Sequence, residues 1–116
     1  LAAGAWGITL ANAAQLRVAR RFGVANLMLA NSLTDPQAIA WVAGEVAGGA
    51  RIVSWVDSVA AVERLQGVLD AADAGPLEVL VEIGGHGGRT GARGVDAARE
   101  VAHPLAYDLA KRPHKL

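Results

Sequence analysis

The sequence Val81–Gly91 (VEIGGHGGRTG) brings together a carboxylate, an imidazole and a guanidinium among five glycines. The three side chains are those of Glu82, His86 and Arg89. Glycine-rich turns that follow a buried parallel strand expose backbone amides and charged groups to ligands in α/β proteins. The stretch is therefore predicted to be a ligand-binding loop.

Each of these side chains also has a plainer interpretation. Arg89 could be a surface arginine that follows a turn. Glu82 stands in an apolar strand, where an unpaired carboxylate is costly. Pairing with Arg89, a position at the mouth of a barrel or an exposed strand end would each explain it. His86 has no second histidine, cysteine or carboxylate at ligand spacing, so contact with solvent or with a ligand is expected rather than metal binding.

The composition excludes several classes of function. The chain has no cysteine, so it has no disulfides, thiolate metal sites or cysteine nucleophiles. Eleven basic and eleven acidic residues give a formal net charge of zero, and only 4% of residues are aromatic, so no nucleic-acid partner is expected. The only lysines are Lys111 and Lys115. No apolar run approaches the roughly 18 to 20 residues of a membrane span, and we see no export signal. We therefore expect a cytoplasmic protein that acts on a small molecule.

Hydrophobic spacing predicts four repeats of a strand followed by a helix. The expected strands are Trp6–Ala11, Leu27–Ala30, Ile52–Val56 and Glu78–Ile83. The expected helices begin at Asn12, at Asp35-Pro36, at Asp57 or Ser58 and near Val95, and they end at Gly23, at Gly48-Gly49, at Gly75-Pro76 and near Ala102. Capping side chains at the helix starts, and glycine or proline at the helix ends, mark these boundaries.

Nearly continuous Val, Ile and Leu strands separated by helices predict a parallel sheet that is covered on both faces. Such a sheet can belong to a doubly wound fold or to a (β/α)8 barrel, and a complete barrel needs on the order of 250 residues. The 116 residues of this chain correspond to about half of one barrel. From residue 104 the pattern fails, so 104–116 is predicted to be an irregular basic tail that follows a domain of residues 1–103.

Four segments in order, LAAGAWGITLANAAQLRVARRFGV, NLMLANSLTDPQAIAWVA, VDS and VEIGGHGGRTG, cover Leu1 to about Ala102. Together they resemble the alanine racemase-type barrel of fold-type III pyridoxal-phosphate enzymes. The branch that they resemble most is that of D-threonine aldolase and D-serine dehydratase, often described as amino acid deaminases. The resemblance implies a partial barrel of about four βα units, strands two to five, and pyridoxal 5'-phosphate as the cofactor.

The resemblance also implies roles for the loop residues. In the racemase motif a lysine, often carbamylated, stands seven positions before an arginine that approaches the phenolic oxygen of the cofactor. Glu82 and Arg89 occupy these positions here. A glutamate supplies directly the carboxylate that carbamylation creates, and it can orient the guanidinium of Arg89. His86 is the third cofactor-binding candidate. Gly84 departs from the motif, which has aspartate there, so a different loop geometry is expected.

In enzymes of this kind the lysine that binds the cofactor covalently should lie on a strand upstream of Leu1, and the phosphate-binding loop and a histidine-containing metal site should lie downstream. The chain is therefore expected to be a fragment of a lyase that acts on D-amino acids, and to be inactive alone. The alternatives are a non-catalytic truncated or frame-shifted product, an alanine racemase-like isomerase and a small anion-binding α/β module. Barrels of this type are usually dimers, so a homodimer is one expectation.

Overall fold

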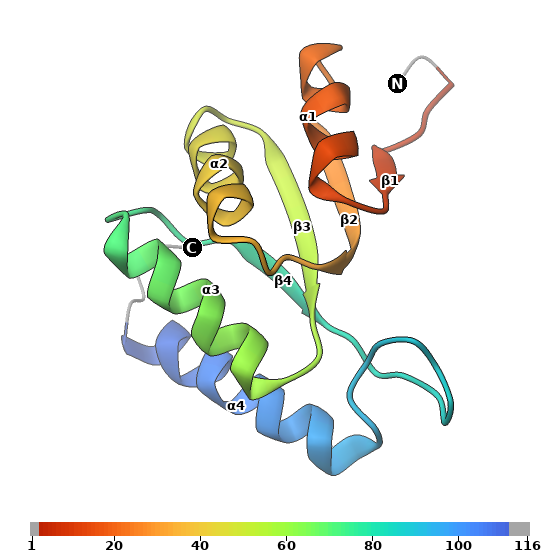
Figure 1. Ribbon diagram of the computed structural model, residues 1–116, viewed down its shortest axis with the longest axis vertical. Helices are drawn as coiled ribbons and strands as arrows, with labels where there is room; N and C mark the ends of the chain where they lie inside the picture. The colour runs from red at the N-terminus through yellow and green to blue at the C-terminus, as the bar shows by residue number, and fades with distance from the viewer. Residues whose placement is uncertain (1–2, 112–116) are drawn as a thin grey trace.

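The computed structural model describes residues 3–111, with side chains described as far as residue 106. Four strands alternate with four helices, and the strands form one parallel sheet in the order β1-β2-β3-β4. Figure 1 shows the helices following one another along the sheet in the same sequence. Neighbouring strands are thus joined by helical crossovers, as in part of a (β/α)8 barrel. The predicted α/β class is confirmed.

The four strands lie where hydrophobic spacing predicted them, to within two residues at either end. They are β1 (Ile8–Leu10), β2 (Asn26–Ser32), β3 (Arg51–Val56) and β4 (Glu78–Val81). The predicted fourth strand extended to Ile83, whereas the observed one stops at Val81 and Ile83 makes only an isolated bridge to Ala92. Glu82 therefore lies just past the end of the strand.

The helices are α1 (Ala13–Arg21), α2 (Pro36–Ala47), α3 (Val59–Ala71) and α4 (Val95–Lys111). Asn12, Asp35 and Ser58 cap the first three, since each side chain accepts hydrogen bonds from backbone amides of the first turn. Asp57 does not cap α3. That helix also ends before Gly75-Pro76, because Asp73 adopts a positive φ of 46° and the amide of Ala74 closes back on Leu69.

One face of the sheet packs against the helices. The strand residues in this packed core all point to the same side by their register: Ile8, Leu10, Leu27, Leu29, Ile52, Val56, Val79 and Val81. Residues between them, such as Thr9, Met28 and Leu80, belong to the other face. Leu80 is 44% exposed. The prediction of a sheet covered on both faces is wrong for the described residues, because their helices pack on one face only. The second face of a barrel sheet lines the barrel interior and is apolar too, so the strand sequences look the same in both cases.

The predicted irregular tail from residue 104 is also wrong as far as Lys111, because α4 continues through Pro104. Proline lacks the backbone N–H that the helix interior uses, which is why the sequence indicated an end here. Packing offsets this loss: Val101 is buried in the core and Leu105, on the far side of the proline, packs against it. The remainder of the predicted tail, 112–116, lies outside the described residues.

Candidate functional site

The carboxyl ends of the four strands meet at one edge of the sheet, and polar side chains from distant parts of the sequence converge there. Asn31 lies near the end of β2, Asp57 directly follows β3, and Glu82 directly follows β4. The loop 84–91 returns to this edge through the bridge between Ile83 and Ala92. In parallel α/β folds ligands bind at the carboxyl edge, so this edge is the candidate site.

Glu82 is held by the residue that follows Arg89 rather than by Arg89 itself. The Thr90 hydroxyl donates a hydrogen bond of 2.9 Å to Oε1 of Glu82. The second oxygen, Oε2, is buried and has no hydrogen-bond partner among the described residues. Between Glu82 and Arg89 no ion pair is present in the described part of the chain. The sequence left several explanations open for Glu82, and a threonine partner was not among them. The structure shows that Thr90 is this partner.

Arg89 lies exposed in the loop and is tethered to β2. Its NH1 group donates a hydrogen bond of 3.3 Å to Oδ1 of Asn31. Asn31 itself is fixed on both sides, because its Oδ1 also accepts from the amide of Ser32 at 3.0 Å and its Nδ2 donates to the carbonyl of Ala11 at 3.3 Å. The guanidinium is therefore held over the strand ends instead of extending freely into solvent.

Asp57 fixes the far side of the loop. Its Oδ2 accepts a hydrogen bond of 3.1 Å from the amide of Gly91. The sequence left open whether Asp57 or Ser58 caps the helix; Ser58 takes that role, and the carboxylate of Asp57 bonds the loop instead. The sequence showed that Asp57 follows a strand, which is where ligand-site residues lie. Because Asp57 and Ser58 are both favourable N-cap residues, the sequence did not show which of them caps the helix.

Close backbone contact explains the departure at Gly84. A Cβ atom at this position would overlap the carbonyl oxygen of Thr90 and the NH1 group of Arg93. Gly91 faces it with a positive φ of 98°, and a Cβ there would overlap the amide nitrogen of Gly84. The predicted difference in loop geometry is consistent with this packing, since an aspartate side chain has no room at position 84.

The loop amides and His86 are less engaged with the site. The amide of Gly84 donates to the carbonyl of Ala92 and that of Gly88 to the carbonyl of Gly85, so these two amides serve the loop itself. The guanidinium of Arg93 also holds the loop, because it donates hydrogen bonds to the carbonyls of Thr90, Gly91 and Gly88. His86 is exposed. Its predicted contact with a cofactor stays a prediction.

A second polar cluster lies at the opposite, amino edge of the sheet. Arg51 donates two hydrogen bonds to Glu78, of 2.8 and 2.6 Å, and its guanidinium lies 5.2 Å from the ring centre of Trp6. The hydrogen bonds from Arg51 lower the pKa of Glu78, and the same bonds raise the pKa of Arg51. Because this cluster joins the first residues of β3 and β4, it serves the sheet rather than the candidate site.

No family model matches the chain, and no curated protein matches it either. Among solved structures, the chain is similar to the D-threonine aldolase from Filomicrobium marinum, with 28% sequence identity and a TM-score of 0.78. The match covers 90% of this chain but only 28% of the aldolase chain. This chain therefore spans less than a third of that enzyme. The similarity agrees with the resemblance that the sequence indicated, and the four parallel strands that alternate with helices are consistent with part of a barrel.

The described residues include neither a membrane-spanning helix nor a cluster of metal-binding side chains. None of their helices is long and apolar enough to cross a membrane. Nor do three histidine, aspartate or glutamate side chains of this described part gather in an arrangement that could hold a metal ion.

Proposed function

We propose that this chain forms four successive βα units in the barrel of a pyridoxal-phosphate-dependent lyase that acts on D-configured β-hydroxy amino acids. The observation that carries the proposal is the similarity to D-threonine aldolase, at 28% identity and a TM-score of 0.78 over 90% of the chain. The geometry of the candidate site adds a cation, Arg89, held at the edge of the sheet where barrel enzymes bind their ligands.

The residues at this edge are chemically suited to part of such a cofactor. The exposed guanidinium of Arg89 can donate hydrogen bonds to an anionic oxygen, and its tether to Asn31 uses NH1. Glu82 brings a buried carboxylate oxygen that has no donor among the described residues. A carboxylate in this state favours a nearby cation. Arg89 is the cation next along the loop, one residue from the Thr90 hydroxyl that already contacts Glu82.

In this proposal the charged and polar side chains of the site have different roles. Arg89 would donate to the ionised phenolic oxygen of the cofactor, and Glu82, which Thr90 holds at the same edge, would offer a carboxylate able to orient the guanidinium once the cofactor is bound. Asn31 limits the directions that Arg89 can take, since it is itself fixed to β2 and to Ala11. Pyridoxal phosphate, when bound, supplies an electron-accepting ring that weakens the bonds at the substrate Cα.

Other parts of the reaction belong outside the strands seen here. β1 to β4 contain no lysine, so the covalent attachment of the cofactor needs a residue from elsewhere in the complete protein. The chain alone is therefore proposed to be inactive. Whether the complete enzyme removes water or cleaves Cα–Cβ depends on residues beyond this segment, and a dimer remains part of the proposal.

A chimera tests the proposal directly. Residues 3–106 of this chain would replace the aligned segment of the Filomicrobium marinum aldolase, and acetaldehyde release from D-threonine and pyruvate release from D-serine would be measured. The proposal predicts that the chimera binds pyridoxal phosphate, seen in its absorption spectrum, and turns over at least one of the two substrates. A folded chimera that binds no cofactor would contradict it.

A further inference from the structure

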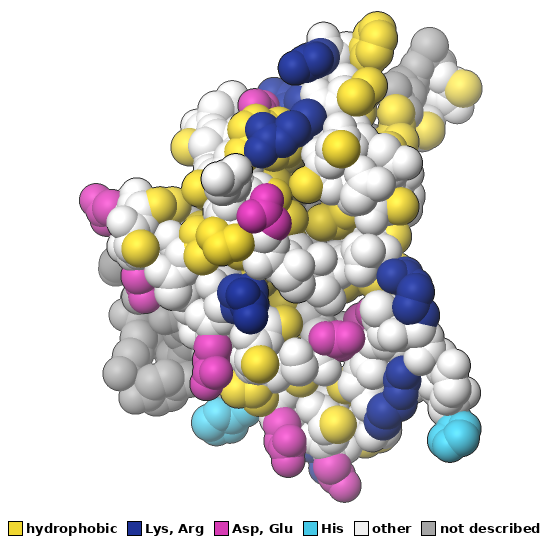
Figure 2. Space-filling model, in the orientation of Figure 1, with side chains coloured by type: hydrophobic (Ala, Val, Ile, Leu, Met, Phe, Trp, Pro, Cys, Tyr) yellow, Lys and Arg dark blue, Asp and Glu magenta, His cyan; other side chains and the backbone are white. Residues whose placement is uncertain are grey.

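A basic groove lies on the outer surface of the fold, between α1 and α2. Five residues line it: Arg17, Arg20, Arg21, Trp41 and Glu45. Its volume is about 250 Å³. Figure 2 shows basic side chains gathered over α1, next to hydrophobic atoms. The groove lies at the C-terminal end of α1, which leads to the amino end of β2, so it is distinct from the candidate site at the carboxyl ends of the strands.

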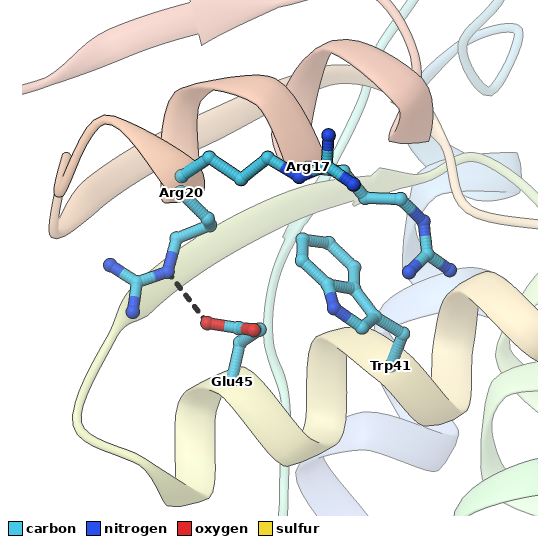
Figure 3. Close-up of a pocket in the computed structure, with 5 residues that line it drawn as sticks. Arg17, Arg20, Trp41 and Glu45 are labelled. Carbon is cyan, nitrogen blue, oxygen red and sulfur yellow. Dashed lines mark hydrogen bonds and ion pairs between the residues drawn. The ribbon is translucent and has the colours of Figure 1, made fainter.

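Two of the arginines have fixed positions in the groove wall. Arg20 donates from Nε to Oε2 of Glu45 at 2.7 Å and from NH1 to the carbonyl of Val24 at 2.8 Å. The guanidinium of Arg17 lies 4.4 Å from the ring centre of Trp41. Figure 3 shows Trp41 and Glu45 rising from α2 toward α1, with Arg17 beside the indole and Arg20 bonded to the carboxylate. These contacts restrict the Arg17 and Arg20 side chains before a ligand binds, so that binding costs less side-chain conformational entropy.

The charges of the groove do not balance. Three guanidinium groups face one carboxylate, that of Glu45, and this carboxylate is already engaged by Arg20. In the described part of the chain neither Arg17 nor Arg21 forms a salt bridge. The dipole of α1 favours cations in its last turn, which accounts for Arg20 and Arg21. It does not account for Arg17, which lies a turn earlier on the same side.

We propose that this groove binds the phosphate group of a small molecule, with Arg17 and Arg21 as the ion-pair donors and the Trp41 indole as an apolar wall. Guanidinium groups match the geometry of phosphate oxygens with two parallel hydrogen bonds. Arg20 is occupied by Glu45 and holds the wall in place. The volume of the groove accommodates phosphate together with a small organic group, so free phosphate and a phosphomonoester share this chemistry.

Calorimetric titration of the chain with inorganic phosphate and with phenyl phosphate tests the proposal. We expect saturable binding of phenyl phosphate, at least tenfold weaker in Arg17→Gln/Arg21→Gln and weaker at higher salt. Tighter binding of phenyl phosphate than of phosphate would show that an organic group adds contacts, as at Trp41, whereas equal affinities would assign the site to the phosphate group alone. Arg64→Gln, an exposed arginine on α3, is the matched control. Arg89→Leu is the second control, because it separates this groove from the candidate site.

Circular dichroism would establish that each variant is folded. If the double variant loses helicity, Arg21→Gln alone provides the test, because Arg21 is exposed at the end of its helix. Absence of saturable binding to either probe would overturn the proposal. An equal loss of affinity in Arg64→Gln, or a loss in Arg89→Leu alone, would do the same, since the binding would then not depend on the groove.

Discussion

Arg89, in the loop after β4, donates a hydrogen bond of 3.3 Å to Asn31, near the end of β2. The two residues are 58 positions apart in the sequence, and β3 lies between their strands in the sheet. The contact spans the carboxyl edge of the sheet. It holds Arg89, the arginine proposed to bind the cofactor, at that edge. Asn31 is thus a positioning residue for Arg89.

Replacing Asn31 tests this tether. In Asn31→Leu the donors on Arg89 and Ser32 and the Ala11 carbonyl all lose their partner. We expect the free energy of unfolding to fall by about 1–3 kcal/mol, measured by urea denaturation. Asn31→Asp keeps the two accepted hydrogen bonds and is the matched control, with a smaller loss. Equal stability of the parent and Asn31→Leu would show that the tether contributes nothing.

Thr90 is expected to matter through its hydroxyl alone. Thr90→Val leaves Oε1 of Glu82 without its donor, in a carboxylate whose Oε2 already has none. The expected loss in the free energy of unfolding is about 1–3 kcal/mol. Thr90→Ser retains the hydroxyl and should remain close to the parent. The same denaturation experiment distinguishes them, and a Thr90→Ser variant as unstable as Thr90→Val would point to the methyl group instead.

The neighbouring glycines Gly84 and Gly85 should respond differently to alanine. A Cβ at Gly84 overlaps Thr90 and Arg93, whereas a Cβ at Gly85 meets nothing within 4 Å. We expect Gly84→Ala to lower the free energy of unfolding by about 1–3 kcal/mol, and Gly85→Ala to leave it nearly unchanged. Thermal melts of the two variants would check this. Similar melting temperatures would mean that the loop is not packed against Arg93 as described.

The loop also shows how far the sequence alone could go. Alternating strand and helix patterns predicted all four βα units, because capping side chains such as Asn12 and Asp35 act locally. The sequence also predicted a ligand-binding loop after the fourth strand, which contains Arg89, but it placed Glu82 within the strand rather than just past its end. It did not predict their partners, Thr90 and Asn31, because these contacts depend on the course of a glycine-rich backbone and on a strand 58 residues away. Long-range contacts of this kind leave no periodic signal.

The end of α4 shows the opposite case, in which a strong local signal was overruled. Pro104 predicted an end to the helix. The apolar residues on either side of it, Val101 and Leu105, still reach the core. Tertiary packing of this kind commonly outweighs helix propensity. A proline in a sequence therefore predicts a helix end reliably only where the residues that follow it do not pack against the core.

Acid should weaken the link between β3 and β4. Arg51 lowers the pKa of Glu78 through its hydrogen bonds, so the folded state binds this proton less readily than the unfolded state. The contribution is therefore present above the ordinary carboxyl pKa of about 4.3 and is lost as the pH falls through the lowered value. Because both side chains are about half exposed, the effect is small. Urea midpoints of the parent and Glu78→Gln should differ at pH 7 and converge as the pH falls below the lowered pKa of Glu78. Glu63→Gln, an exposed control on α3, should show no such convergence.

The role of Arg89 in a pyridoxal-phosphate lyase is tested most directly in the aldolase chimera that carries residues 3–106. Arg89→Leu should reduce kcat/KM by about a hundredfold or more and alter the cofactor absorption, since it removes a donor to a developing anionic oxygen. Arg99→Leu, an exposed arginine on α4, is the control and should leave both unchanged. If Arg89→Leu kept the activity and the cofactor spectrum of the parent chimera, the assignment of the site would be wrong.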